Sequence, residues 1–207
     1  MDPLFPEQTV HRLSGSERLP PRERILIAAR ELFYRHGIQG VGVEAIAEAA
    51  GTNKMTLYRH FESKELLVAE YLRGLAADTL GLWDELAAAH PGDPMAQIIG
   101  WLDSVGGHGA KHDARGCAMV NAAMQISDPE HPGRKAVEAA QRIHHDRLAA
   151  LCRATGVEAP EQLADQLFLL VEGSRSSYRS LGPDGPGASL CSLAAALIAA
   201  HRPNPAG

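Results

Sequence analysis

The chain has 207 residues and a formal net charge of −5, which leaves room for one or two domains with a full hydrophobic core. It has no uncharged apolar run of about 18 residues, and its first residues lack the pattern of a signal peptide. We therefore expect a cytoplasmic protein without a membrane span. Cys117, Cys152 and Cys191 are odd in number and widely spaced, which argues against a disulfide framework and a cysteine zinc site.

The acidic net charge is unevenly distributed. Residues 1–64 contain nine Lys or Arg against eight Asp or Glu, so they carry +1 and leave −6 for residues 65–207. This pattern is typical of an acidic body with a relatively basic surface for nucleic acid, and it disfavours a protein that coats nucleic acid along its whole length.

The N-terminal residues 1–20 are polar, contain proline and show no period, so we predict a flexible arm. Arg12 and Arg18 leave two interpretations open. They are either part of a solvated tail or an arm that reaches into a DNA minor groove.

The next three elements predict short helices around a glycine turn. Pro21 suits the first position of a helix whose apolar residues follow helical spacing and which Gly37 and Gly40 end. A second helix is expected over residues 43–50. Gly51 then makes the turn, because glycine adopts a left-handed backbone most easily, and Asn53 is a good N-cap for the third helix.

The remainder of the chain also predicts helices. Ser63 caps a long helix that runs to about residue 89, where a Pro-Gly-rich segment stops it. Further helices are expected over residues 95–105, 117–126, 134–155, 161–181 and 188–201, with a loop over 106–110. No strand pattern competes, so the predicted fold class is all-α with about nine helices.

The third helix carries the polar and basic groups that a helix in a DNA groove needs. Short polar and basic side chains near its N-terminal end suit contacts with base edges and phosphates. The segment over residues 41–61 is therefore interpreted as a helix-turn-helix that binds DNA. The candidate contacts are Thr52, Asn53, Lys54, Thr56, Tyr58, Arg59, His60 and Lys64.

Residues 22–71, above all IAEAAGTNKMTLYRHFESKELL, resemble the N-terminal domain of the TetR family of transcriptional regulators. The "LYRHF" followed by "SKE" is far more specific than a generic helix-turn-helix. The resemblance implies DNA contacts by the residues just named, with Lys64 on a phosphate. Val43 departs from the family, where a Thr or Ser is common, and Met55 stands where a small residue is common. The implied domains are the arm, a DNA-binding domain over 21–65 and an effector-binding and dimerisation domain over 66–207.

Each of the last two predicted helices carries an apolar face that must pack against another surface. Residues Leu190, Leu193, Ala194, Leu197 and Ile198 lie on one face of the last helix, with small residues opposite. The stripes are compatible with intrachain core. The resemblance implies a homodimer through these two helices, as a palindromic operator requires.

The resemblance also implies a small-molecule effector held by the middle helices. Ligand sites are mainly apolar with a few placed polar groups. The residues predicted to line the apolar walls of this site are Leu82, Trp83, Trp101, Met119, Met124 and Phe168, and Cys117 is a further candidate for effector binding. The candidate polar groups are Asn121, Gln125, Glu172, Arg175 and Tyr178.

The favoured interpretation is a ligand-responsive repressor, without catalysis or cofactor, that a small molecule releases from its operator. An alternative is a metal- or thiol-responsive regulator of the same fold that uses Cys117 with His108, His112, His144 and His145, although their spacing matches no strong zinc pattern. A second alternative is an enzyme or scaffold that borrowed the fold, but no nucleophile elbow, phosphate loop or HExxH motif is present.

Overall fold

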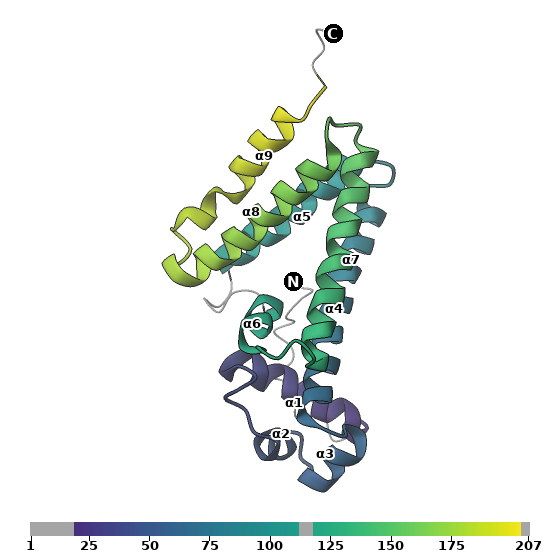
Figure 1. Cartoon of the computed structure of the whole chain (residues 1–207), viewed down its shortest axis with the longest axis vertical. Helices are drawn as coiled ribbons and strands as arrows, with labels where there is room; N and C mark the ends of the chain where they lie inside the picture. Colours follow the sequence, from purple (N-terminus) through teal and green to yellow (C-terminus); the bar gives the residue numbers. More distant parts are fainter. Residues whose placement is uncertain (1–18, 112–117, 204–207) are drawn as a thin grey trace. The chain divides into compact units, whose positions relative to one another are not determined.

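The structure is a computed structural model that describes residues 19–111 and 118–203, except the side chains of residues 107–111. Within these ranges the fold is all-α, as predicted, with nine α-helices, one 3₁₀ helix and no strand (Figure 1). The elements are α1 (Pro21–His36), α2 (Val43–Ala49), α3 (Lys54–His60), α4 (Lys64–Ala89), α5 (Pro94–Lys111), α6 (Ala118–Gln125), α7 (Pro132–Ala154), α8 (Pro160–Leu181), η3 (Pro186–Ser189) and α9 (Leu190–Ala200).

The chain divides into two compact units. Of the described residues, the first unit contains 19–79 and 118–140, and the second contains 80–111 and 141–203. Helices α4 and α7 each have one part in either unit, because the boundaries at residues 79 and 140 fall inside them. No helix in the described part of the chain is long and apolar enough to cross a membrane.

The first unit packs α1, α2 and α3 around a small apolar core. Ile25 of α1, Ile46 of α2 and Leu57 of α3 are fully buried. Phe33 of α1 meets Tyr71 of α4 with ring centroids 5.4 Å apart, so the first part of α4 contributes to the same core. The buried residues of α1 follow the helical apolar spacing from which this helix was predicted.

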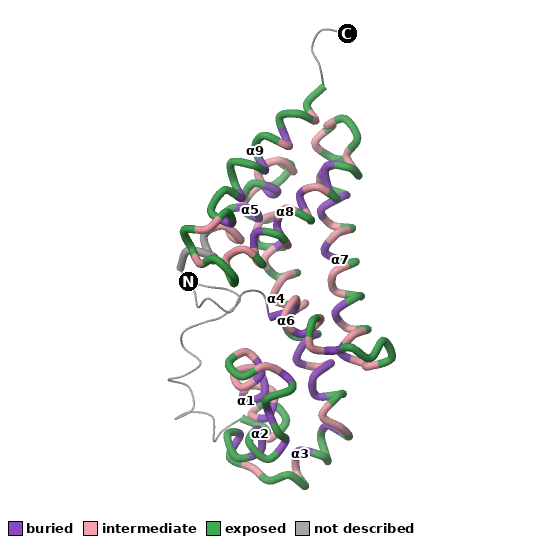
Figure 2. The backbone as a smooth tube through the Cα atoms, turned by 60° about the vertical axis from the view of Figure 1, so that its left-hand side comes forward, coloured by how far each residue is buried: buried purple, intermediate pink, exposed green. Residues whose placement is uncertain are grey.

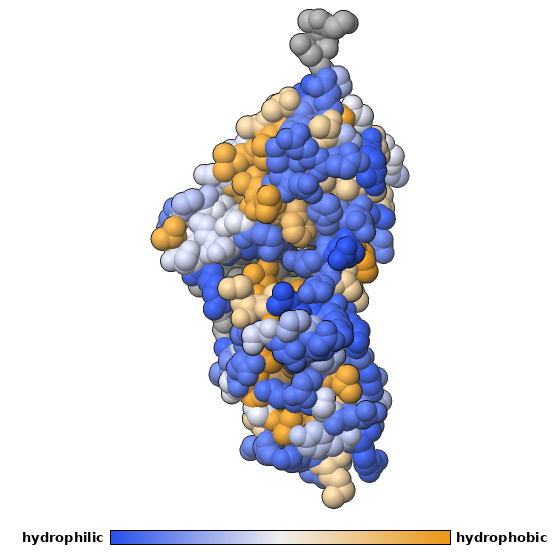
Figure 3. Space-filling view, viewed as in Figure 1, coloured by the Kyte–Doolittle hydropathy of each residue, from blue (hydrophilic) through white to orange (hydrophobic). Residues whose placement is uncertain are grey.

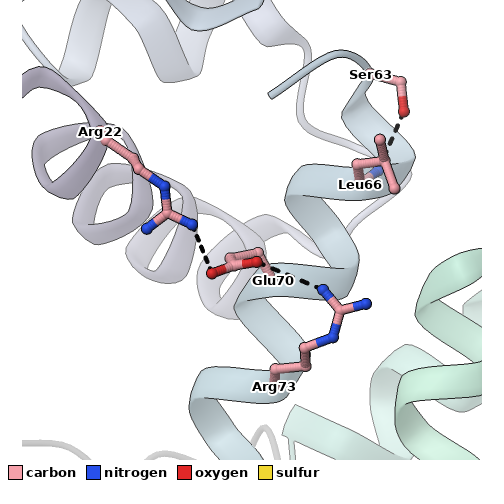
Figure 4. Close-up of polar contacts among 5 residues, drawn as sticks. All are labelled: Arg22, Ser63, Leu66, Glu70 and Arg73. Atoms are coloured by element: carbon pink, nitrogen blue, oxygen red, sulfur yellow. Dashed lines mark hydrogen bonds and ion pairs between the residues drawn. The ribbon is translucent and has the colours of Figure 1, made fainter. Parts of the chain in front are cut away.

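Local signals set the helix ends of the first unit as the sequence predicted. Gly51 has φ of +61°, in the left-handed region that glycine adopts without strain. The side chain of Asn53 accepts a hydrogen bond from the Thr56 amide at 2.9 Å and caps α3. Likewise, Ser63 Oγ accepts from the Leu66 amide at 3.1 Å at the start of α4 (Figure 4).

The second unit has an apolar core of its own. The buried face of α8 follows helical spacing, and the same holds for α9, so both helices lie half in the core and half at the surface (Figure 2). The buried residues of these two helices are Leu163, Ala164, Leu167, Val171, Leu190, Ala194 and Ile198.

One predicted loop is wrong. Residues 106–110 were expected to break the chain because three of them are glycine, but α5 continues through them to Lys111. The position of a Cβ on Gly106 would lie 3.1 Å from Cys191 Sγ, and the Tyr178 hydroxyl lies 3.5 Å from the Gly106 carbonyl oxygen. Close packing against α8 and α9 therefore overrides the low helix propensity of glycine at this point.

Candidate nucleic-acid interface

Helices α2 and α3 are joined by a tight turn of the kind that the sequence predicted. The Gly51 amide donates to the Glu48 carbonyl oxygen and the Thr52 amide to that of Ala47, both at 2.9 Å. The Arg24 guanidinium from α1 lies 3.4 Å from the Gly51 carbonyl oxygen. Backbone hydrogen bonds and a neighbouring helix thus fix the direction in which α3 leaves the turn.

Helix α3 turns one face inward and the other to solvent (Figure 2). Leu57 and the adjoining Phe61 are buried, and the Arg22 guanidinium lies over the Phe61 ring, 5.2 Å from its centroid. Among the predicted DNA contacts, the exposed residues are Asn53, Lys54, Tyr58, Arg59 and His60, and the half-buried ones are Thr52, Thr56 and Lys64. Solvent-facing polar side chains at the start of a helix are what base and phosphate contacts require.

Lys54, the first residue of α3, forms an ion pair within the protein. Lys54 Nζ lies 2.6 Å from a carboxylate oxygen of Glu44 on α2. The hydrogen bond with Glu44 raises the pKa of Lys54, and the same bond lowers the pKa of Glu44. Both side chains are exposed, so the pair is weak in water and a phosphate oxygen can compete for the ammonium.

Lys64 has a partner that the sequence did not reveal. Its Nζ donates to the Ile38 carbonyl oxygen at 2.7 Å, in the loop between α1 and α2. An ammonium has three donors, so the bond leaves capacity for a phosphate oxygen. The predicted phosphate contact stays a prediction, and the structure adds a role for Lys64 in holding the α1–α2 loop against α4.

Gln125, the last residue of α6, makes further contacts with the loop between α1 and α2. Gln125 Oε1 accepts from the Ile38 amide at 2.8 Å, and the Gln39 side chain donates to the Gln125 carbonyl oxygen at 3.3 Å. Gly37 allows this approach, because a Cβ there would lie 2.7 Å from Gln125 Oε1. Gln125 was predicted to bind an effector, and its contact with the α1–α2 loop was not predicted. No local signal marks it, since 86 or more residues separate the partners.

Ion pairs add to the contacts between α1 and α4. The Arg22 guanidinium lies 2.6 Å from one carboxylate oxygen of Glu70, and that of Arg73 lies 3.4 Å from the other (Figure 4). Arg30 of α1 pairs with Asp78 further along α4. The Arg22–Glu70 and Arg30–Asp78 pairs join the two helices, and because they are partly exposed each contributes at most about 1 kcal/mol.

The second unit contains an aromatic cluster around a buried histidine. Trp83 and Trp101 stack with centroids 5.4 Å apart, and the Trp83 indole Nε1–H donates to His144 Nδ1 at 2.9 Å. Phe168 lies 6.0 Å from the His144 ring. Burial, together with smaller contributions from the positive charges of Arg175 and His145, lowers the pKa of His144 to about 4. The imidazole is therefore neutral at physiological pH.

The residues predicted to bind an effector fall in different parts of the chain. Seven described ones lie in the second unit: Leu82, Trp83, Trp101, Phe168, Tyr178, Glu172 and Arg175, the last two paired at 2.8 Å. Met119, Asn121, Met124 and Gln125 lie on α6 in the first unit, where Met124 is 84% exposed. Cys117 lies outside the described residues. The effector assignments therefore stay predictions.

The described residues offer no metal site. No group of three His, Cys, Asp or Glu side chains among them is arranged to hold an ion. His145 Nε2 lies 2.7 Å from a carboxylate oxygen of Asp165. Burial raises the pKa of the Cys152 thiol to about 11, so that thiol stays protonated and unreactive. His112 and Cys117, on which the metal or thiol alternative depends, lie outside the described residues, as does most of the predicted arm.

Three short helices in which an exposed helix, α3, follows a glycine turn have the geometry of a helix-turn-helix, the DNA-binding element of many transcriptional regulators. Comparison with known families agrees. Residues 25–71 match the family described as "Bacterial regulatory proteins, tetR family". A curated relative aligns beyond this segment: the HTH-type transcriptional repressor SCO4008 of Streptomyces coelicolor is 31% identical over 158 residues, 72% of this chain and 74% of the relative. The chain belongs to the TetR family of DNA-binding transcriptional regulators.

Two further comparisons differ in what they cover. The HTH-type transcriptional repressor KstR2 of Rhodococcus jostii is 41% identical over 68 residues, which is 33% of either protein. The crystal structure of SCO4454, a TetR-family regulator from Streptomyces coelicolor, matches with a TM-score of 0.82. That match covers 88% of this chain and 96% of SCO4454 at 24% identity, so it shows a shared fold.

Proposed function

We propose that this chain is a homodimeric repressor that binds a palindromic operator through α3 and leaves it when a small molecule binds the second unit. The observation that carries the DNA-binding part is the exposed polar face of α3 behind the Gly51 turn. The names of two relatives, SCO4008 and KstR2, favour repression over activation.

A dimer is supported by the exposed apolar surface of α8 and α9. Leu169 is 71% exposed, Leu181 64% and Leu193 50%, and small residues such as Ala195 and Ala199 are exposed beside them. Hydrophobic surface is visible over these helices (Figure 3). Large apolar side chains in a contiguous exposed area mark an interaction surface. A second copy would cover them and set two copies of α3 about one DNA turn apart, roughly 34 Å.

The effector is proposed to be an apolar or amphipathic small molecule. The aromatic cluster of Trp83, Trp101 and Phe168 supplies apolar surface, and the Glu172–Arg175 pair supplies polar groups. Because α4 has one part in either unit, a displacement of this helix would reach the DNA-binding part. To move the operator from mostly bound to mostly free, the ligand must favour the released conformation by roughly 10⁴-fold, about 5.5 kcal/mol.

The DNA-binding part is tested by salt-dependent gel shift with the DNA upstream of the chain's own gene. We expect Arg59→Ala, on the exposed side of α3, to weaken binding and flatten the salt slope by about one per half-site. Arg142→Ala removes the same charge from an exposed position on α7 and serves as the matched control. The proposal fails if no DNA is bound in a salt-sensitive way, or if the two variants behave alike.

The effector part is tested with the chain's own tryptophans. The chain has only two, Trp83 and Trp101, and both lie in the aromatic cluster. Titration with a panel of apolar compounds is expected to change their fluorescence at the concentrations that release the operator. Release without any fluorescence change would place the effector site elsewhere.

The dimer is tested by sedimentation of Leu169→Asp, which is expected to sediment as a folded monomer. Ile143→Asp makes the same change at a half-exposed residue of α7 and is expected to remain dimeric. A wild-type chain that sediments as a monomer would contradict the proposed dimer.

A further inference from the structure

One apolar side chain stands out on the DNA-facing side of α3. Met55, the second residue of the helix, is 76% exposed. Leu57, two residues further along the helix, is buried in the core of the first unit and fixes the rotation of α3 about its axis. Because neighbouring positions of a helix point in different directions, the same rotation that buries Leu57 places Met55 in solvent.

The polar groups around Met55 are engaged within the protein. Asn53 uses its side-chain oxygen to cap α3 by accepting from the Thr56 amide. Lys54 is paired with Glu44 at 2.6 Å. The Met55 thioether has no such polar partner in the described residues, so its long side chain is available to an external surface without first breaking an internal bond.

We propose that Met55 reads a thymine in each operator half-site through the 5-methyl group of the base. The inference rests on the proposed operator binding by α3. Residues at the N-terminal end of a recognition helix contact base edges in the major groove. There the thymine methyl is the one apolar group, and apolar side chains are its usual partners. Methionine suits this contact because its unbranched, polarizable side chain adapts to the position of the methyl group.

The occupant of this exposed surface is therefore double-stranded DNA with a thymine at a fixed position. The alternative occupants, an internal segment or a protein partner, would have to cover the same face as the exposed Tyr58 and Arg59. Continuity with these polar residues of α3 favours DNA, since a phosphate-rich partner suits them and a purely apolar partner does not.

The experiment starts with the full-length chain and a random duplex library, from which the preferred operator is selected. Each thymine of that operator is then replaced by deoxyuridine, which keeps base pairing and lacks only the 5-methyl group. For one thymine in each half-site, we expect replacement to weaken wild-type binding about fourfold, or about sixteenfold when both half-sites are changed. Replacement of thymines elsewhere in the operator is expected to change nothing.

Two variants test whether Met55 is the side chain that contacts the thymine methyl group. Met55→Ala should bind the thymine and deoxyuridine operators equally well, because the apolar contact is gone. Met55→Leu keeps a side chain of similar volume and should retain the sensitivity to the methyl group. Since Met55 is exposed, both variants are expected to unfold at the same urea concentration as the wild type, which is measured in parallel.

The outcomes separate this inference from the proposed function. If the chain selects an operator but tolerates deoxyuridine at every position, Met55 does not read a thymine methyl, while operator binding by α3 stands. If Met55→Ala keeps the full sensitivity, another side chain reads the methyl and the inference is wrong. If no sequence is selected at all, the proposed operator binding fails together with the inference.

Discussion

The two units of the chain are stabilised in different ways. In the first unit, individual polar contacts hold the α1–α2 loop, where the Ile38 peptide groups bond to both Gln125 and Lys64. In the second unit, a large apolar core surrounds one buried polar pair, Trp83 and His144. Single substitutions at these loop contacts are therefore expected to distort the DNA-binding part locally, whereas in the core of the second unit the costly changes are truncation of a buried side chain and introduction of a charge.

Two glycines of the first unit test its dependence on single positions. Gly37 has φ of +74°, and a Cβ there would lie 2.7 Å from Gln125 Oε1, so Gly37→Ala strains the backbone and displaces that side chain. We expect a loss of about 1–3 kcal/mol. Gly74 lies inside α4 with no atom within 4 Å of its Cβ position, so Gly74→Ala should gain about 0.5–1 kcal/mol. Urea unfolding of both variants measures the difference.

That pair of variants also tests how strictly the first unit depends on the loop conformation at Gly37. Equal effects of the two substitutions would show that the loop conformation at Gly37 is not specified as the contacts indicate. A double variant Gly37→Ala, Gln125→Ala separates the causes. If the clash with Gln125 dominates, Gly37→Ala costs less stability in the Gln125→Ala background than in the wild type, and if backbone strain dominates, it costs the same in both.

The second unit is expected to lose stability in acid because of His144. Burial lowers the pKa of this imidazole from 6.5 to about 4, so the folded chain binds fewer protons than the unfolded chain between these values. The free energy of unfolding is therefore unaffected by titration of His144 above pH 6.5, and it decreases as the pH falls from 6.5 towards 4. At pH 4.5 the loss should be on the order of 2 kcal/mol, measured by urea unfolding relative to pH 7.5.

Carboxylates also titrate between pH 4 and 6.5, so a variant that lacks only the His144 imidazole is needed as a control. His144→Gln keeps an acceptor for the Trp83 indole N–H and has no titrating group. Its stability should depend less on pH than that of the wild type, by the amount assigned to His144. A wild type and a variant with parallel pH profiles would show that the imidazole is charged in the folded chain or is not buried.

The sequence predicted the first unit well because local chemistry decides it. The cap at Asn53, the turn at Gly51 and the start of α4 at Ser63 each depend on a residue type that suits one backbone conformation. The apolar period likewise predicted the first helix, whose buried residues include Ile25. These features need no knowledge of distant residues, so a single sequence suffices.

Contacts between distant residues explain what the sequence did not predict. Gln125 and Lys64 converge on Ile38 from 87 and 26 residues away, and nothing in their local sequence marks the pairing. The glycines after Val105 favoured a loop, yet packing against Cys191 and Tyr178 keeps α5 helical. In the second unit, the stacked Trp83 and Trp101 were identified as candidates, but their shared partner His144 was assigned to a different hypothesis.

Asn53 allows the smallest and most discriminating test, because it has a structural and a proposed DNA-binding role at once. Its side-chain oxygen caps α3, so Asn53→Ala should lower stability by about 1 kcal/mol in urea unfolding. Serine caps helices as well as asparagine does, so Asn53→Ser should unfold like the wild type. It nevertheless lacks the amide N–H donors that a base or phosphate contact uses. Weaker operator binding by a fully stable Asn53→Ser variant, by about 1–3 kcal/mol, would assign a DNA contact to the amide. Unchanged affinity and sequence preference would instead restrict Asn53 to the cap, and the DNA-binding surface of α3 would then begin at Lys54.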